Sequence, residues 1–300
     1  MLKDFNAMAE MVKQHPVKKR IVLACAHDEH SLQAVNEAYK EGIVEPILVG
    51  KEDEIRRIIK NNGFALGDAT IYNADEDVEA AKKAVKLINE GKGDFLMKGK
   101  MQTADLLKQV VNKETGLNLG KTMSHVGLFE VTNYHKVVAL TDGGMLPHPT
   151  LEQKKDIIEN AVDALHNMGY ENPKVSVVCA AEKLNKKAVE STDAAALKEM
   201  NENGEIKGCI VEGPISYDIS MSKEIADFKG FQSPVAGDVD IMVVPDMASG
   251  NMLGKAWVIN GGGKMTGLVC GAKCPIVLTS RGSSAEEKFY SIVFAAAASK

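Results

Sequence analysis

The sequence predicts an α/β protein built of two three-layer α/β domains with an interdomain cleft. Short apolar runs alternate along the chain with amphipathic helical stretches, the pattern of a largely parallel sheet covered by helices on both faces. The alternation is interrupted once, between residues 121 and 141, by two adjoining strand-like runs. The length of 300 residues suits one large domain or two of about 150 residues each.

The first series of elements begins with Arg20–Ala26, an apolar and β-branched run that is typical of a buried strand. The stretches between such runs carry apolar residues at helical spacing, which indicates helices that cover the sheet. The expected strands are Arg20–Ala26, Pro46–Val49, Thr70–Tyr72 and Phe95–Met97, and the expected helices are Ser31–Lys40, Glu52–Asn61, Asp75–Asn89 and one that begins near Thr103.

The interruption predicts a hairpin, because two strand-like runs flank the short polar join at residues 132–134. A second α/β series follows, and the chain closes with one more strand and helix. The expected strands are Val126–Val131, Lys136–Thr141, Val175–Ala180, Gly208–Val211, Val239–Val244 and Pro275–Thr279, and the expected helices are Leu151–Met168, Asp193–Asn201, Asn251–Trp257 and Ser284–Ala298.

The composition excludes several classes of protein. Hydrophobic residues make up 45% and charged residues 26% of the chain, as in ordinary globular proteins. The net charge of −5 argues against a general binder of nucleic acid or of membrane surfaces. Residues 1–19 are polar and resemble neither a signal peptide nor a membrane anchor. Five scattered cysteines favour free thiols in a reducing compartment, so we expect a cytoplasmic protein.

The turn after the last expected strand is the first candidate site. A strand that feeds a helix through a Gly/Ser-rich turn collects free backbone N–H groups, which favour a phosphate or a carboxylate. Ser280 and Gly282 lie in this turn, and Arg281 adds a guanidinium suited to phosphate. The alternative is a capped helix with a surface arginine, because Ser284 and Glu287 have the spacing of a capping box.

Lysines mark two further candidate sites for an anion. Lys98 and Lys100 flank a glycine after the strand Phe95–Met97, and Thr103 can cap the next helix. Lys264 follows three glycines, which allow a backbone to approach a ligand closely. The alternatives are solvated lysines in the first case and an ordinary flexible loop in the second.

Histidines offer weaker candidates. Ser124 and His125 precede an apolar strand and could face the cleft, although a lone histidine is more often a structural group. His27 and His30 have a spacing that metal ligands also use. However, Asp28 between them is typical of a helix cap and no third ligand is evident, so no metal site is expected.

Taken together and in order, a set of segments resembles the phosphate acetyl/butyryl transferase family, the butyryl branch most closely. The resemblance covers nearly the whole chain and is strongest at residues 96–105, 123–126 and 133–136. It continues through residues 151–155, 172–175, 193–197, 208–214, 245–246, 248–251 and 275–281.

The resemblance implies two α/β domains similar to those of the isocitrate and isopropylmalate dehydrogenases. The first would be residues 1–137 plus 275–300, the second residues 138–274, and the protein would form a homodimer or a larger homo-oligomer. The implied reaction joins acyl-CoA and inorganic phosphate to give acyl phosphate and CoA, by direct transfer in a ternary complex. Coenzyme A is then a substrate, and neither a metal nor a redox cofactor is required.

The resemblance also implies roles for individual residues. Ser280 would help to polarise the acyl carbonyl or would hold the developing oxyanion. Arg281 would hold the phosphoryl group and neutralise charge at the transition state, and Glu287 would stand where the acetyl branch has an aspartate base. Glu287 departs from that pattern by one methylene and is also the capping-box residue. The expected substrate- and phosphate-binding residues are Lys98, Lys100, Thr103, Ser124, His125, Asn251, Lys264 and Gly282.

Two other functions stay open at this point. A phosphate acetyltransferase would differ only in acyl length, and one methylene in an apolar pocket is worth about 1–3 kcal/mol. A non-catalytic two-domain protein that binds a small molecule would show no turnover.

Overall fold

The computed structural model describes residues 2–279 and 283–300. The chain forms two compact units, and each is described by itself. The terminal unit comprises Phe5–Lys121 and Thr266–Lys300, and the middle unit comprises Met1–Asp4 and Thr122–Met265. These units divide at 121/122 and 265/266, whereas the domains expected from the sequence divide at 137/138 and 274/275. The expected hairpin is therefore part of the middle unit, and the expected domain limits stay a prediction.

The terminal unit contains a sheet with the strand order β3-β2-β1-β4-β11-β10. Neighbouring strands run parallel except β10, which is antiparallel to β11. The strands are β1 (Lys19–Ala24), β2 (Val44–Gly50), β3 (Thr70–Asn73), β4 (Phe95–Lys98), β10 (Lys264–Cys270) and β11 (Ile276–Val277). The first two residues of β10, Lys264 and Met265, belong to the middle unit. The carboxyl ends of β1, β4 and β11 consequently meet at one edge, where α/β sheets bind ligands.

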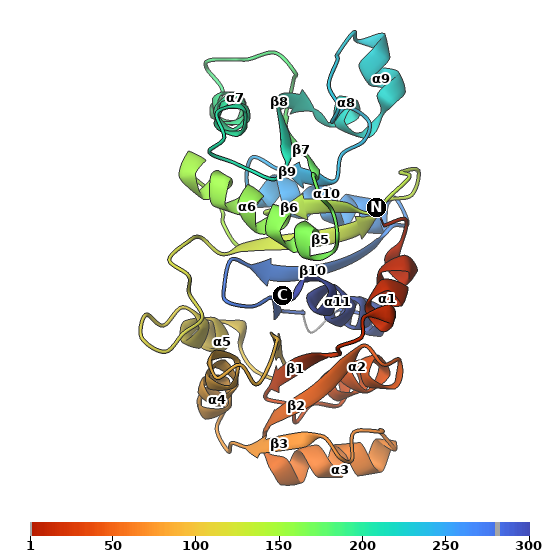
Figure 1. Cartoon of the computed structure of the whole chain (residues 1–300), viewed down its shortest axis with the longest axis vertical. Coiled ribbons are helices and arrows are strands. Elements are labelled where there is room, and N and C mark those ends of the chain that lie inside the picture. Colours follow the sequence, from red (N-terminus) through yellow and green to blue (C-terminus); the bar gives the residue numbers. More distant parts are fainter. Residues whose placement is uncertain (1, 280–282) are drawn as a thin grey trace. The chain divides into compact units, whose positions relative to one another are not determined.

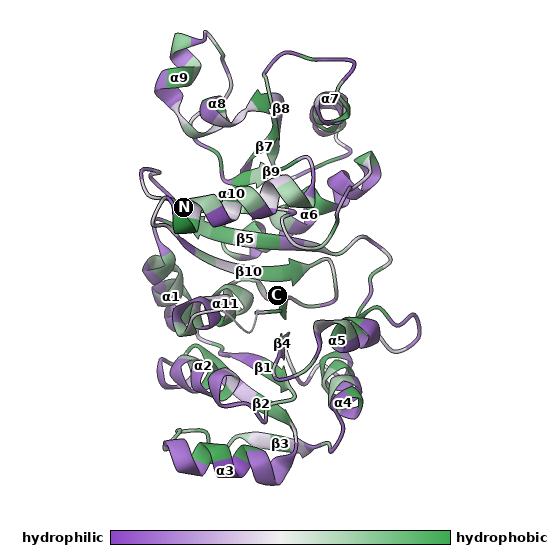
Figure 2. Cartoon of the chain, turned by 180° about the vertical axis from the view of Figure 1, so that it is seen from behind, coloured by the Kyte–Doolittle hydropathy of each residue, from purple (hydrophilic) through white to green (hydrophobic). Residues whose placement is uncertain are grey.

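Helices lie on both faces of this sheet. In Figures 1 and 2, α4 and α5 lie on one side of it, and α1, α2 and α11 lie on the other. The helices of the terminal unit are α1 (Phe5–Gln14), α2 (Glu29–Lys40), α3 (Glu52–Asn62), α4 (Asp77–Asn89), α5 (Thr103–Val110) and α11 (Ala285–Ala298). Helix α3 buries only Ile55 and Ile59, whereas α11 is buried from Tyr290 to Ala298. In Figure 2, α3 carries both purple and green segments, whereas the strand β10 is mostly green.

The middle unit contains strands in the order β5-β6-β9-β7-β8. The pair β5–β6 is antiparallel and the other pairs are parallel. The strands are β5 (Ser124–Glu130), β6 (Val138–Thr141), β7 (Lys174–Cys179), β8 (Ile210–Ser216) and β9 (Ile241–Val243); the helices are α6 (Leu151–Asn167), α7 (Val189–Glu202), α8 (Tyr217–Met221), α9 (Lys223–Phe228) and α10 (Met247–Ile259). Helices α6 and α10 cover opposite faces (Figures 1 and 2).

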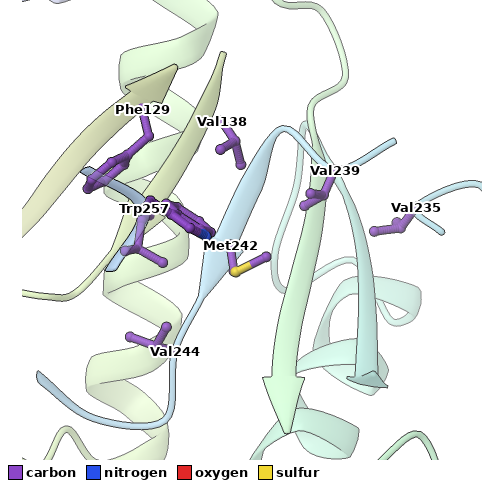
Figure 3. Packing of buried hydrophobic residues seen from close by; sticks show 8 residues of the cluster. Phe129, Val138, Val235, Val239, Met242, Val244 and Trp257 are labelled. Carbon is purple, nitrogen blue, oxygen red and sulfur yellow. The ribbon is translucent and has the colours of Figure 1, made fainter. Parts of the chain in front are cut away.

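The core of the middle unit forms where α10 packs on β5 and β6. Figure 3 shows Trp257 of α10 beside Phe129 and Met242. The Phe129 and Trp257 rings meet edge to face with their centroids 5.1 Å apart. A Cβ at Gly254 would lie only 2.8 Å from the Phe129 ring, so the glycine allows this close approach. The packing holds the middle and the last turns of α10 against the sheet.

The α/β fold class with helices on both faces is confirmed, and so is the hairpin, in which Gly127 pairs with Leu140. Three local details differ from the sequence prediction. The polar N-terminal region contains α1, and the glycine-rich stretch near Lys264 leads into β10. Thr103 is the first residue of α5 rather than its cap, which is Gln102.

No helix in the described part of the chain is long and apolar enough to cross a membrane.

Candidate active site

A pocket of about 360 Å³ opens at the carboxyl edge of the sheet in the terminal unit. Its walls come from the segments that follow β1, β4 and β11 and from the beginnings of α2 and α11. The residues that line it are Asp28, His30, Ser31, Lys98, Gly99, Lys100, Met101, Thr279 and Lys288. Three lysines and two helix N-termini favour an anionic ligand at this place.

Lys98 and the turn behind it form the floor of the pocket. Lys98 is only 7% exposed, and its Nζ donates to the carbonyl oxygens of Gly99 and Met101 at 3.2 Å each. A Cβ at Gly99 would lie 2.3 Å from the carbonyl oxygen of Cys25, so only glycine allows the turn to pass so close to β1. Lys100, the next residue, is exposed. Both predicted lysines therefore lie at the same pocket.

Asp28, the N-cap of α2, also lines the pocket. Its Oδ2 accepts the backbone N–H of Ser31 at 3.0 Å and the Ser31 hydroxyl at 2.5 Å. The sequence indicates a helix cap at this position, and the structure confirms it. The cap engages one carboxylate oxygen, Oδ2, and no hydrogen bond of the other oxygen is found among the described residues.

The last described residue before the expected catalytic turn, Thr279, also lines the pocket. Ser280, Arg281 and Gly282 lie outside the described residues, so their assigned roles stay predictions. The pocket nevertheless reaches the point in the chain where those residues begin.

Glu287 lies in the first turn of α11, and its surroundings are those of a helix start. Its backbone N–H donates to the hydroxyl of the N-cap Ser284 at 3.1 Å. Its carboxylate accepts the Ser283 hydroxyl at 2.7 Å. The predicted N-cap is confirmed, and the carboxylate takes part in local hydrogen bonding.

Ser124 and His125 begin β5 in the middle unit and face different neighbours. Ser124 is buried and accepts the side-chain amide of Asn160 at 2.9 Å. His125 lies beside Gly144, because a Cβ at that glycine would be 3.1 Å from the imidazole Cγ. The His125 Nδ1 is buried and has no hydrogen-bond partner among the described residues.

The charge that acts on His125 comes from Asp142, which directly follows β6. The Asp142 Oδ1 accepts the N–H groups of Gly144 and Met145 at 2.8 and 2.9 Å, and its Oδ2 is buried without a partner in the described chain. Burial lowers the pKa of His125 below its ordinary value of 6.5, and the Asp142 carboxylate partly opposes this shift. Asn251 is close by, since its amide donates to the Gly143 carbonyl oxygen at 3.3 Å.

Two predicted site residues are not brought together with these groups. Lys264 begins β10 beside Glu130, because a Cβ at Gly263 would lie 2.5 Å from the Glu130 carbonyl oxygen. Glu130 is the last residue of β5 and His125 is near its start, so the strand separates them by roughly 17 Å. Thr103 is exposed on α5 and does not line the pocket of Lys98. The predicted roles of Lys264 and Thr103 in substrate binding stay predictions.

His27 and His30 have different neighbours. The His27 Nε2 lies 3.8 Å from the Asp77 carboxylate, whereas His30 lines the pocket at the start of α2. Within residues 2–279 and 283–300, no group of three or more His, Cys, Asp or Glu side chains is arranged to hold a metal ion.

Sequence reasoning missed Lys288 and Asp142. Lys288 lies in the first turn or so of α11, where a lysine is disfavoured by the positive end of the helix dipole. Asp142 follows a buried strand and precedes two glycines, the usual setting for a turn residue with a role at a sheet edge.

The chain is similar to proteins of one known family. The family model described as phosphate acetyl/butaryl transferase matches residues 6–84 and 76–296. A phosphate butyryltransferase of Clostridium acetobutylicum is 43% identical over 296 residues, covering 99% of this chain and 98% of the relative. A phosphate acetyltransferase of Thermotoga maritima is 44% identical over 278 residues, covering 93% of this chain and 94% of the relative.

Solved structures agree with the sequence comparisons. A branched-chain phosphotransacylase from Enterococcus faecalis superposes with a TM-score of 0.82 at 31% identity, covering 93% of this chain and 98% of the other. Matches of this extent, over nearly the whole chain, define membership: the chain belongs to the phosphate acetyl/butaryl transferase family.

Proposed function

We propose that this protein transfers a short acyl group, butyryl in the first place, between coenzyme A and inorganic phosphate. The observation that carries the proposal is the lysine-lined pocket that ends at Thr279, the residue before Ser280 and Arg281. The membership of the family and the 43% identity to a phosphate butyryltransferase support the same reaction.

In the proposed reaction, a phosphate oxygen attacks the acyl carbon of the thioester. The new C–O bond forms, the C–S bond breaks, and the thiolate leaves with the electron pair and takes up a proton. Lys98 and Lys100 would attract the phosphate, which carries negative charge throughout. Ser280 would polarise the acyl carbonyl, and Arg281 would neutralise charge on the phosphoryl group.

Glu287 is the proposed proton acceptor for the CoA thiol in the reverse direction. A carboxylate at that position follows the family pattern, with one methylene more. Its hydrogen bond from Ser283 orients the carboxylate at the beginning of α11. The proposal includes CoA as a substrate and requires neither a metal nor a redox cofactor.

The length of the acyl chain that the protein prefers separates two candidate functions. The relatives include a phosphate acetyltransferase at 44% identity, so acetyl transfer is the second candidate function. An apolar pocket separates two acyl chains by about 1–3 kcal/mol per methylene, so both substrates can react at different rates. A comparison of kcat/KM on acetyl-, butyryl- and branched acyl-CoA decides between them.

We also propose that the protein acts as a homodimer or larger homo-oligomer. Apolar side chains on α9 and α10 of the middle unit support this, with Phe228 92%, Ile259 76% and Met252 66% exposed. Met252 and Ile259 are two turns apart on α10 and so share a face. Light scattering on the purified chain tests the association, and a monomeric mass would contradict it.

The proposed location is the cytoplasm. The five cysteines support it, because all of them are buried and none forms a disulfide among the described residues, as expected in a reducing compartment. Fractionation of cells that express the full chain tests the location.

The experiment that tests the function measures release of the CoA thiol from butyryl-CoA with and without phosphate. Release that requires phosphate supports acyl transfer. Binding without turnover would instead indicate a non-catalytic binding protein.

A further inference from the structure

Lys288 is a buried lysine whose side chain has no hydrogen-bond or ion-pair partner among residues 2–279 and 283–300. It is only 8% exposed. The other buried lysines do not share this property. Lys136 lies 2.6 Å from Asp240, Lys154 lies 2.8 Å from Asp193, and Lys98 donates to two carbonyl oxygens.

A buried ammonium group without a counter-charge is costly, so its presence indicates an anion that is bound during function. Lys288 lines the same pocket as Lys98, and it stands near the N-terminus of α11. The helix end and both lysines favour negative charge at one point. A dianion of the size of phosphate matches these requirements.

Asp28 also lines this pocket. A carboxylate is unexpected beside a bound oxyanion, because the two negative charges repel each other. One of its oxygens, Oδ2, is fully engaged with Ser31, and the other has no hydrogen-bond or ion-pair partner among the described residues. The free oxygen is a strong acceptor that can receive a hydrogen bond but cannot donate one. It therefore favours an oxyanion that carries a hydroxyl group.

We propose that this pocket recognises the protonated form of its oxyanion. Lys288 supplies the main counter-charge, together with Lys98. The Asp28 carboxylate accepts a hydrogen bond from the hydroxyl group of hydrogen phosphate. Inorganic phosphate keeps at least one hydroxyl at neutral pH, whereas sulfate has none, so Asp28 selects phosphate and rejects sulfate. The inference rests on the proposed function, because it assigns the phosphate of that reaction to this pocket.

The test compares phosphate and sulfate on the full-length protein. Calorimetric titration with each anion gives the two dissociation constants without any need for turnover. Initial rates with butyryl-CoA give the KM for phosphate and the inhibition constant for sulfate. If the chain binds phosphate but shows no phosphate-dependent CoA release, the proposed function fails while the anion site stands.

Asp28→Asn is the sharpest variant, because asparagine caps a helix as well as aspartate does and has the same shape. We expect sulfate to bind about tenfold more tightly and phosphate to bind more weakly, since the amide lacks the charge that selects a hydroxyl. Asp246→Asn is the matched control, a neutralised cap on α10 that should leave the sulfate-to-phosphate ratio unchanged.

Lys288→Met removes the charge and keeps the length of a buried side chain. We expect the KM for phosphate to rise about tenfold or more while the KM for butyryl-CoA stays the same. Lys108→Met, at an exposed position on α5, controls for loss of one positive charge. If Lys288→Met fails to fold, Lys288→Arg keeps the charge and should retain phosphate binding.

Two results would overturn the inference. One is an unchanged phosphate affinity in folded Lys288→Met. The other is an Asp28→Asn variant that changes phosphate and sulfate affinity by the same factor, which would make Asp28 a helix cap and nothing more.

Discussion

The hydroxyl of Ser283 donates to the carboxylate of Glu287 at 2.7 Å, at the beginning of the last helix. Glu287 also donates its backbone N–H to the hydroxyl of Ser284, the N-cap of that helix. Glu287 is thus tied to the helix start by both its backbone and its side chain. Removal of a proton acceptor lowers kcat, whereas removal of a capping residue lowers the stability of the fold. The two roles of Glu287 can therefore be separated by experiment.

Glu287→Gln is expected to lower kcat by about 10²-fold or more, the usual contribution of a positioned general base. The amide keeps the size of the side chain and can still accept from Ser283, so the melting temperature should change little. Steady-state kinetics and thermal unfolding of the same preparation check this. A normal kcat with a lower melting temperature would leave Glu287 with the capping role alone.

Arg281→Ala is expected to lower kcat/KM by about 10²- to 10³-fold, the range found when one donor to a developing charge is removed. Arg281→Lys should recover only part of the loss, because lysine cannot form the bidentate contact. Circular dichroism should show an unchanged fold in both variants. Activity close to that of the native protein would remove Arg281 from the site.

His125 is expected to make stability depend on pH. Burial holds its pKa in the folded protein below the ordinary value of 6.5, so the unfolded chain binds the proton more readily. Stability therefore rises with pH across this window, and it is lost as the pH falls from 6.5 toward the folded pKa. The His125→Gln variant should lose less stability than the native protein over that range. Parallel profiles of melting temperature against pH would contradict the assignment.

Gly254→Ala is expected to destabilise the middle unit, although alanine is the better helix former by about 1 kcal/mol. Its Cβ would lie 2.8 Å from the Phe129 ring, and overpacking of this kind costs about 1–3 kcal/mol. Gly67→Ala is the control, because a Cβ there would meet nothing within 4 Å. Denaturant unfolding measures both, and equal stabilities would show that the Phe129 contact relaxes without cost.

Local patterns predicted the elements that position the site. The strand before Lys98, the cap at Asp28 and the cap at Ser284 each depend on residues within a few positions of one another. Such features can be read from sequence because short-range sterics and hydrogen bonds determine them.

Features that depend on contacts between distant segments were missed. Helix α1 carries Phe5, Met8, Ala9 and Val12 at helical spacing, but it becomes stable only by packing against α11 at the other end of the chain. The helical spacing of these apolar residues indicates a helix, but the polar composition of residues 1–19 did not suggest one.

The same limit applies to the site. That Lys288 and Lys98 share a pocket depends on β11 lying next to β4, a pairing across about 180 residues of chain, which no local motif encodes. The proximity of Asp142 to His125 likewise depends on the register of β5 against β6.

The central claim is that this chain moves an acyl group from CoA to phosphate. It is tested most directly by incubating the protein with butyryl-CoA and following free thiol and acyl phosphate together, with and without phosphate. We expect thiol release only when phosphate is present, with acyl phosphate formed in equal amount. Thiol release at the same rate without phosphate, or no release at all, would contradict the claim.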